Sequence, residues 1–249
     1  MRKFGLIGYP LGHSFSKGYF TEKFNKNRLT ECSYENYPLT SLDHLPELIS
    51  DTSLVGLNVT IPYKSSVMQY LSKIDHEAET IGAVNVIKIK RVGNEPVLSG
   101  YNSDITGIRD TLIPNLGPGI KNALVLGSGG SSKAVCHVLN GINVPFTLIS
   151  REKKDFCLTY SEITPELLSN SHLIINTTPL GMFPDITGKP DIRYELLDEK
   201  HILFDLVYNP EITSFLKMGQ ERGCTILSGI RMLHSQAEKS WEIWNNEDL

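Results

Sequence analysis

Hydrophobic residues along this chain recur in short blocks, and their spacing switches repeatedly between that of strands and that of helices. Apolar runs bounded by glycine, proline or polar residues predict buried strands, whereas apolar residues three or four positions apart predict amphipathic helices. The predicted strands are residues 4–7, 54–60, 84–90, 95–99, 123–126, 146–150, 173–177, 202–207 and 225–227, and the predicted helices are residues 19–24, 42–49, 62–71, 105–112, 134–141 and 230–244. This alternation is typical of an α/β protein built from two successive αβ blocks that join near residues 100–105.

Two segments carry more specific local predictions. Residues 84–90 and 95–99 flank the turn signal Val92-Gly93-Asn94, so we expect them to pair as a hairpin. Residues 155–164 are expected to form an irregular crossover, because the apolar pattern after Ser150 is weak and contains Pro165.

Composition and charge exclude several classes of protein. The 249 residues are 40% hydrophobic and 21% charged, which is ordinary for a globular chain, and the formal net charge is -4. Because no concentrated basic face is evident, we expect no nucleic-acid partner. The four cysteines and seven histidines are scattered, so neither a disulfide framework nor a metal site is predicted. No apolar run approaches membrane length, and we expect a cytoplasmic protein with no membrane partner.

The most informative single motif is an apolar strand that runs into a glycine-rich turn and then a helix. Gly127 permits a tight turn, Gly129 lets the backbone approach phosphates, and Ser132 is small enough to pack against the strand. In this context backbone N–H groups and the helix dipole hold a pyrophosphate. A structural turn without a ligand is the alternative, and the flanking strand and helix disfavour it. The candidate cofactor-binding residues here are Gly127, Ser128, Gly129, Gly130, Ser131 and Ser132.

The end of the next strand indicates which dinucleotide is bound. An NAD enzyme usually places Asp or Glu there for the ribose 2′-hydroxyl. This chain has Ser150 and Arg151 instead, and two lysines follow. A guanidinium matches phosphate geometry, so NADP is the predicted cofactor. Glu152 opposes this prediction because its charge repels a phosphate unless it points away, and a solvated basic loop is the alternative.

Polar clusters also mark the first block and its end. Taken singly, each has an ordinary structural explanation: Ser14 and Ser16 suit a turn or a helix N-cap, and Lys64 suits a solvated helix. Asp104 suits the cap of the helix that follows it. The clusters are residues 12–16, 58–64, 82–85 and 102–104.

The order of these clusters changes their meaning. With later motifs, they make a series that resembles the shikimate dehydrogenase family along nearly the whole chain. Eight ordered matches make coincidence a poor explanation. The matching segments are residues 8–16, 58–64, 82–85, 102–104, 127–132, 176–182, 205–210 and 229–237.

The resemblance implies a fold of two αβ domains around a deep cleft. Residues 1–104, with a returning C-terminal helix at 232–249, are expected to bind substrate, and residues 105–231 are expected to form a Rossmann-type NADP-binding domain. The implied activity is the reversible, NADPH-dependent reduction of 3-dehydroshikimate to shikimate, on the route to chorismate and the aromatic amino acids. A monomer or homodimer is expected, with a small-molecule substrate.

The resemblance also implies roles by position. Lys64 and Asp104 look like the catalytic pair, and Ser14 and Ser16 look like the hydroxyls that bind the substrate carboxylate. The other implied substrate contacts are Asn58, Thr60, Asn85, Tyr208 and Gln236, and the further implied cofactor contacts are Ser150, Arg151, Thr177, Met182, Gly229 and Met232.

The expected chemistry suits these residue types. Ketone reduction needs a hydride at carbon, supplied by the cofactor, and a proton at the developing alkoxide. A lysine ammonium supplies the proton and stabilises the oxyanion. Which of Lys64 and Asp104 moves the proton stays open, and Asp104 is otherwise expected to orient the lysine.

Three alternatives stay open at this point. A quinate dehydrogenase, or an enzyme that takes both shikimate and quinate, with NAD as the alternative cofactor, would need room near Ser14 and Ser16 for an extra hydroxyl. A methylenetetrahydrofolate dehydrogenase shares a two-domain plan and a catalytic lysine but gives no reason for the two serines. A non-catalytic metabolite sensor on the same scaffold would not need both Lys64 and Asp104.

Overall fold

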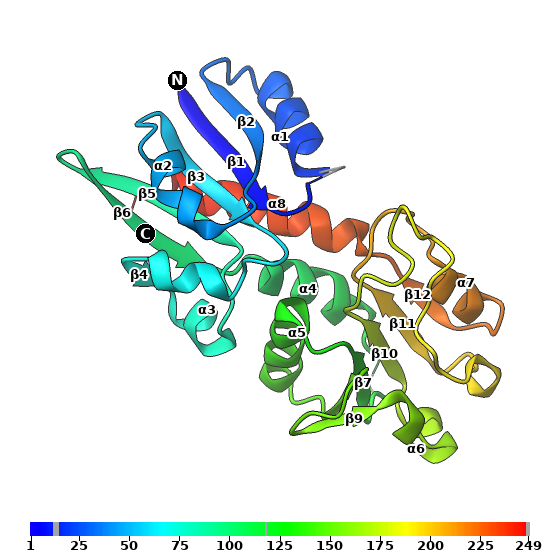
Figure 1. Ribbon diagram of the computed structural model, residues 1–249. Helices are drawn as coiled ribbons and strands as arrows, with labels where there is room; N and C mark the ends of the chain where they lie inside the picture. Colours follow the sequence, from blue (N-terminus) through cyan, green and yellow to red (C-terminus); the bar gives the residue numbers. More distant parts are fainter. Residues whose placement is uncertain (12–14, 118, 248–249) are drawn as a thin grey trace. The chain divides into compact units, whose positions relative to one another are not determined.

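The computed structural model describes residues 1–11, 15–117 and 119–247 and divides the chain into two compact units (Figure 1). Unit 1 comprises Met1–Ser103 with Ala237–Leu249, and unit 2 comprises Asp104–Gln236. The long helix α8 (Gly229–Asn245) therefore contributes residues to both units. Each unit contains its own six-stranded sheet, which confirms the predicted α/β class.

A mixed sheet forms the centre of unit 1, with the strand order β2-β1-β3-β5-β6-β4. β1 is parallel to both β2 and β3, whereas β5 is antiparallel to β3 and β6. The predicted hairpin is confirmed: Val92 pairs with Glu95 around Gly93, whose φ of 63° suits glycine. The strands are β1 (Arg2–Gly8), β2 (Cys32–Pro38), β3 (Leu54–Val59), β4 (Lys73–Ile74), β5 (Val86–Val92) and β6 (Glu95–Tyr101).

Short helices complete unit 1. α1 (Phe15–Lys26) buries Phe20 and Phe24. α3 (His76–Ile81) begins where the Asp75 carboxylate accepts the N–H of Glu77 and ends at the left-handed Gly82. The remaining helices are α2 (Leu45–Ile49) and the 3₁₀ helices Leu42–His44 and Ser66–Tyr70.

The helix predicted over residues 62–71 is confirmed only in part, because it begins later and is a 3₁₀ helix. The backbone there closes a turn, with the N–H of Tyr63 donating to the Thr60 carbonyl, and the carbonyl of Lys64 accepts the N–H of Val84. These bonds leave only the 3₁₀ helix Ser66–Tyr70. β2 and α3 were not predicted, because the polar residues within them obscure any apolar period.

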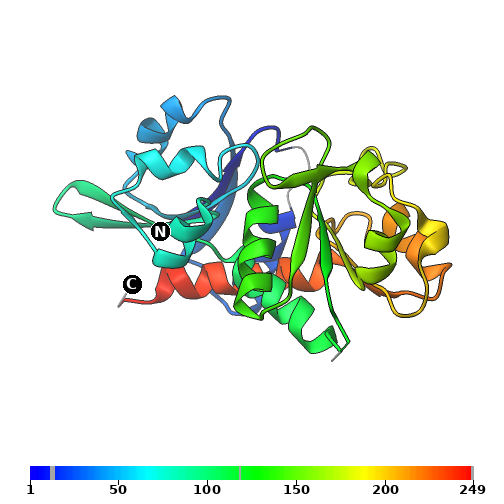
Figure 2. The ribbon, with the colours of Figure 1, turned by 90° about the horizontal axis from the view of Figure 1, so that it is seen from below.

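Aromatic side chains form much of one core of unit 1. Phe4, Phe20 and Trp244 are buried and packed together, with the Phe4 and Trp244 ring centroids 4.8 Å apart. Trp244 approaches β3 so closely that a Cβ at Gly56 would lie 2.5 Å from its indole. The C-terminal part of α8, red in Figure 2, is thereby fixed against the sheet of unit 1.

Unit 2 contains a sheet whose strands are all parallel, in the order β12-β11-β10-β7-β8-β9. From β7 the chain builds outward through β8 and β9, then returns to β10 on the other side of β7 and continues to β11 and β12. This is the doubly wound order of a Rossmann fold, with its switch point between β7 and β10. The strands are β7 (Ala123–Leu126), β8 (Phe146–Ser150), β9 (Cys157–Thr159), β10 (Leu173–Asn176), β11 (Ile202–Asp205) and β12 (Thr225–Leu227).

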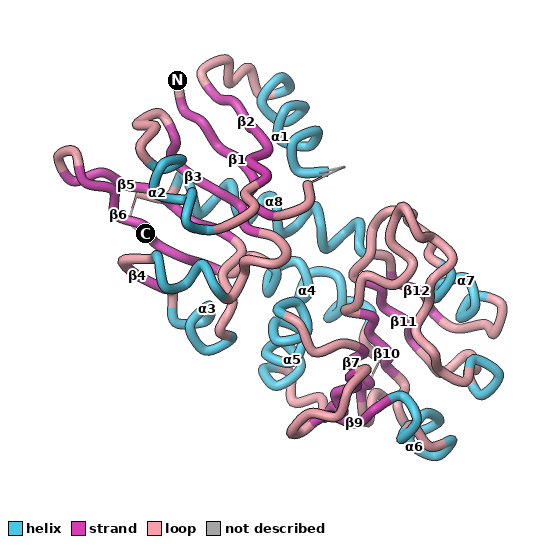
Figure 3. Tube along the Cα trace, viewed as in Figure 1, coloured by secondary structure: helices cyan, strands magenta, loops and turns pink. Residues whose placement is uncertain are grey.

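The helices of unit 2 are α4 (Asp104–Leu112), α5 (Gly130–Gly141), α6 (Pro165–Asn170), α7 (Ser214–Gln220) and part of α8, with 3₁₀ helices at Ile113–Asn115, Tyr160–Glu162 and Tyr194–Leu196. The crossover after β8 contains the short strand β9, so residues 155–164 are not wholly irregular. Pro165 starts α6 rather than interrupting it, because proline fits the first turn and Thr164 caps it. Figure 3 shows most of the connection between β10 and β11 as loop.

Candidate active site

The glycine turn after β7 lies at the switch point of unit 2. Gly127 has a φ of 115°, and a Cβ there would lie 2.5 Å from the Thr177 hydroxyl. Thr177 follows β10, and its hydroxyl donates to the Leu126 carbonyl at 2.7 Å. Glycine is therefore required at position 127 for two reasons: its backbone conformation, and the close approach of the neighbouring strand end.

The N-terminus of α5 is open for an anion. Gly129 is its N-cap and provides no side-chain cap for the first N–H groups, and a Cβ at Gly129 would meet nothing within 4 Å. The Ser132 hydroxyl is buried and donates back to the Gly129 carbonyl at 2.6 Å. Uncapped N–H groups at a helix N-terminus bind phosphate, so the geometry suits a pyrophosphate.

Basic residues after β8 divide between two positions. The Lys154 ammonium donates to the Ser128 hydroxyl at 2.9 Å, which places it on the glycine turn. Lys153 instead pairs with Glu162 at 2.6 Å. The side chain of Ser150 is buried with its hydroxyl 3.4 Å from that of Ser128, and Arg151 is exposed. The sequence pattern predicts Arg151 as the 2′-phosphate contact, and it does not distinguish Lys154 from the adjacent Lys153.

A buried polar cluster ties together the loops that follow β10 and β11. The Asn176 amide donates to one oxygen of the Asp205 carboxylate at 3.0 Å, and the Thr213 hydroxyl donates to the other at 2.6 Å. Burial raises the pKa of Asp205 to about 6, although hydrogen bonds from Thr213, Val207 and Asn176 oppose the rise. Both Asn176 and Asp205 lie in motifs that the sequence singled out, but neither was assigned a role.

The remaining residues predicted for the nicotinamide end lie on the same loops and on α8. Met182 is 41% exposed, whereas Met232 is buried. A Cβ at Gly229 would lie 2.5 Å from the Leu206 carbonyl, and one at Gly107 would lie 2.5 Å from the Met232 carbonyl. Both glycines therefore permit close backbone approaches that position the start of α8 within unit 2.

In unit 1, Asn58 lies at the centre of a buried chain of hydrogen bonds. Its Oδ1 accepts from the Tyr34 hydroxyl at 2.8 Å, and its Nδ2 donates to the Ser240 hydroxyl at 2.9 Å and to the Asn85 carbonyl at 3.4 Å. Asn58 is 6% exposed, so these bonds hold its amide in one orientation.

The series of buried hydrogen bonds continues from Ser240 through Ser103 to Asn85. The hydroxyls of Ser240 and Ser103 lie 3.1 Å apart, and the N–H of Ser103 donates to Asn85 Oδ1 at 2.7 Å. The structure thus joins two predicted substrate residues, Asn58 and Asn85, through hydroxyls that the sequence did not assign. Ser103 lay within a matched motif; Tyr34 and Ser240 carried no sequence signal.

The other predicted residues are distributed between the units. Thr60 and Lys64 follow β3 and are both half-buried. Asp104 is the first residue of α4, belongs to unit 2 and is buried, and Tyr208 and Gln236 are half-buried residues of unit 2. Ser14 lies outside the described residues.

Comparisons with known proteins bear on the whole chain. Residues 6–87 match the family described as the shikimate dehydrogenase substrate binding domain. A curated protein of Methanococcus aeolicus, "Shikimate dehydrogenase (NADP(+))", is 36% identical over 259 residues, which cover 96% of this chain and 90% of that protein. One of the same name from Clostridium beijerinckii is 38% identical and covers 100% of this chain and 94% of its own length.

This chain belongs to the shikimate dehydrogenase family. A crystal structure of a family member from Thermus thermophilus, in complex with NADP(H) and shikimate, is similar with a TM-score of 0.85 and 28% identity, covering 98% of this chain and 94% of that chain. The family fold has an N-terminal substrate domain and a Rossmann-like domain, which agrees with the mixed sheet of unit 1 and the doubly wound sheet of unit 2.

Two further findings concern the part of the chain that the structure describes. No helix there has both the length and the apolar character needed to cross a membrane. Over residues 1–11, 15–117 and 119–247, no three His, Cys, Asp or Glu side chains are grouped as metal ligands would be.

Proposed function

We propose that this chain catalyses the reversible, NADPH-dependent reduction of 3-dehydroshikimate to shikimate, with Lys64 and Asp104 as its catalytic pair. The observation that carries the proposal is family membership over nearly the whole chain, with 36% identity to an NADP-dependent shikimate dehydrogenase. The two sheets and their loops supply side chains of the kinds this reaction needs.

The nucleotide is assigned to unit 2. The positive φ of Gly127 and the uncapped start of α5 form a backbone cradle that suits a pyrophosphate. Arg151 and Lys154 are assigned to the 2′-phosphate, since both are exposed cations in the segment that follows β8, and Lys154 reaches back to the Ser128 hydroxyl on the turn after β7. Bound NADPH supplies the hydride, and Thr177, Met182, Gly229 and Met232 are assigned to its nicotinamide end.

Shikimate is assigned mainly to residues of unit 1. Ser14 and Ser16 are assigned to its carboxylate, which two hydroxyl donors recognise without a buried arginine. The side chains assigned to its hydroxyls are Asn58, Thr60, Asn85, Tyr208 and Gln236. Asn58 and Asn85 are held by buried hydrogen bonds. A shikimate analogue that lacks a partner hydroxyl would leave a polar group of the site unpaired.

Lys64 is assigned the proton transfer. In the direction of reduction its ammonium donates a proton to the alkoxide oxygen that develops, and its charge stabilises that oxygen. In the direction of oxidation the neutral amine takes the proton from the hydroxyl. The Asp104 carboxylate is assigned to orient the ammonium.

The test is an absorbance assay of NADPH oxidation with 3-dehydroshikimate. We expect turnover by the unmodified chain and a loss of kcat of about 10²–10⁴-fold in Lys64→Ala, with the shikimate Kd changed by less than about fivefold. Lys73→Ala is the matched control, since Lys73 is an exposed lysine on β4 in unit 1. Near-normal kcat in Lys64→Ala would refute the catalytic assignment, and absence of turnover by the unmodified chain would refute the function. The reverse assay, which follows NADP+ or NAD+ reduction with shikimate or quinate as the alcohol substrate, separates the alternatives.

A further inference from the structure

We propose that Tyr34 and Ser240 are positioning residues of the shikimate site, which hold the Asn58 amide between them in the orientation that binds substrate. This inference rests on the proposed function, because it takes Asn58 as a substrate contact. Neither Tyr34 nor Ser240 lies in any of the motifs that characterise the chain, and each comes from an element far from Asn58 in sequence: Tyr34 from β2 and Ser240 from α8.

The orientation of the Asn58 amide is decided by the Asn85 carbonyl. A backbone carbonyl only accepts, so the atom of Asn58 that lies 3.4 Å from it must be Nδ2. Turning the amide over would set two acceptor oxygens against each other. The Tyr34 hydroxyl fits this orientation by donating to Oδ1 at 2.8 Å, and the Ser240 oxygen fits it by accepting from Nδ2 at 2.9 Å.

The Tyr34 hydroxyl is itself rigidly held. Tyr34 is 2% exposed, and its ring stacks on that of Phe20, with centroids 4.7 Å apart and an angle of 11° between the planes. Burial raises the pKa of Tyr34, while a hydrogen bond from the Ser16 side chain opposes the rise. The phenol therefore stays a neutral donor in the physiological range, and it lies between Ser16 and Asn58, two residues assigned to the substrate.

Ser240 links Asn58 to the second asparagine of the site. It is fully buried, and its hydroxyl lies 3.1 Å from that of Ser103, which contacts Asn85. The Ser240 hydroxyl accepts from Asn58 Nδ2 and lies within hydrogen-bond distance of Ser103 Oγ, and either hydroxyl can be the donor in that second contact. Removing the Ser240 hydroxyl therefore loosens Asn58 directly and Asn85 through Ser103.

The first experiment compares Tyr34→Phe and Ser240→Ala with controls that lose equally buried hydroxyls elsewhere. Tyr194→Phe is one control, since that hydroxyl donates to the Pro190 carbonyl at 2.8 Å in unit 2. Ser171→Ala is the other, since its hydroxyl donates to the Leu167 carbonyl at 2.7 Å. We expect each site variant to raise the KM for shikimate about 5- to 20-fold, with kcat and the KM for NADP within about twofold. The controls should leave all three constants unchanged.

The second experiment asks whether Tyr34 acts through Asn58. In an Asn58→Ala background, Tyr34→Phe should raise the shikimate KM no further, whereas independent effects would multiply. The inference is overturned if the two substitutions multiply their effects on the shikimate KM. It is also overturned if Tyr34→Phe lowers Tm but leaves the shikimate KM unchanged. Either result leaves the proposed function intact. If Tyr34→Phe does not fold, Ser240→Ala and its cycle with Asn58→Ala decide the question by the same criteria. An unmodified chain without turnover overturns the proposed function, and the inference with it.

Discussion

The Asn176 amide donates a 3.0 Å hydrogen bond to the fully buried carboxylate of Asp205, and this bond joins the ends of the neighbouring strands β10 and β11. The loops that start at these strand ends carry Thr177, Met182 and Tyr208. A buried carboxylate therefore braces the part of unit 2 to which the nicotinamide is assigned.

The pKa of Asp205 makes this brace sensitive to pH. A folded-state pKa of about 6, above the usual value of 3.8, means that the folded protein binds the proton more tightly than the unfolded chain. Its contribution to stability is therefore complete below about pH 4 and is lost as pH rises to about 6, by an amount of about 3 kcal/mol. In Asp205→Asn this dependence should be absent. Thermal unfolding of both proteins from pH 4 to 8 measures it, and parallel Tm curves would contradict the assignment.

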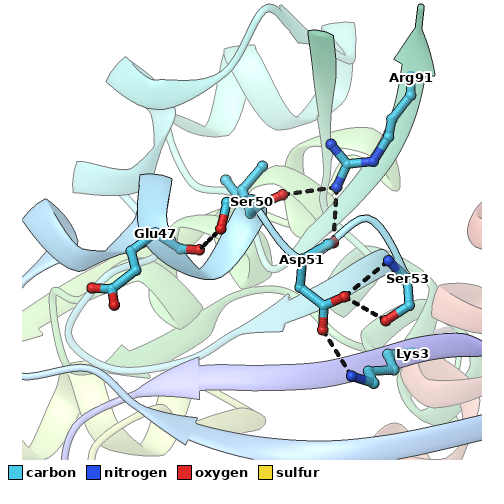
Figure 4. A network of polar contacts seen from close by, with 7 residues as sticks. Lys3, Glu47, Ser50, Asp51, Ser53 and Arg91 are labelled. Carbon is cyan, nitrogen blue, oxygen red and sulfur yellow. Dashed lines mark hydrogen bonds and ion pairs between the residues drawn. The ribbon is translucent and has the colours of Figure 1, made fainter. Parts of the chain in front are cut away.

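In unit 1, Asp51 makes stability depend on pH in the opposite direction: its contribution to stability is lost as pH falls. Its carboxylate accepts from the Lys3 ammonium at 2.8 Å and from the hydroxyl and N–H of Ser53, while Arg91 donates to its backbone carbonyl (Figure 4). These bonds, the one from Lys3 first, lower the pKa of Asp51. The stability that they provide is present above about pH 4 and is lost as pH falls below it.

Asp51→Asn should therefore lower Tm at pH 7 by only about 1–3 °C, because the side chain is partly exposed and its ion pair is screened. Activity should not change. The difference from the unmodified protein should shrink as the pH is lowered toward 3, and a difference independent of pH would show that the ionised carboxylate is not what stabilises this turn.

Gly127→Ala should weaken the nucleotide site specifically. A Cβ there meets the Thr177 hydroxyl at 2.5 Å and forces a left-handed backbone on alanine, so the turn must move. We expect the Kd for NADP, measured by fluorescence or calorimetry, to rise about tenfold or more, with the Kd for shikimate unchanged. Gly141→Ala, at the other end of α5, meets nothing within 4 Å and is the control. Unchanged NADP binding would remove this turn from the cofactor site.

The two adjacent lysines after β8 should differ in their effect on cofactor choice. Lys154 contacts Ser128 on the glycine turn, whereas Lys153 pairs with Glu162. Lys154→Ala should raise the KM for NADP about 5- to 10-fold and leave the KM for NAD nearly unchanged, because only NADP carries the 2′-phosphate. Lys153→Ala should change either value less than about twofold. Equal losses with both cofactors in Lys154→Ala would place the lysine away from the 2′-phosphate.

Much of the fold follows from local sequence. The bounds predicted for β7 and β8 are those that the structure gives. β7 is buried along its whole length, and a strand buried on both faces is a continuous hydrophobic segment. β2 escaped prediction because only Cys32 and Tyr34 of its seven residues are buried. The start of the helix in residues 62–71 was placed too early. The Lys64 carbonyl accepts a hydrogen bond from the N–H of Val84, about twenty residues away, and no local pattern reveals that partner.

The sequence alone determined the family, the α/β class and the identity of the polar residues assigned to each half of the site, because motif order is a property of the chain. Tertiary structure decided which of those residues share hydrogen bonds. It placed Tyr34 and Ser240 against Asn58, and Lys154 rather than Lys153 on the glycine turn. Such contacts join segments distant in sequence or depend on how one loop turns, and so they exist only once the sheets are formed and packed.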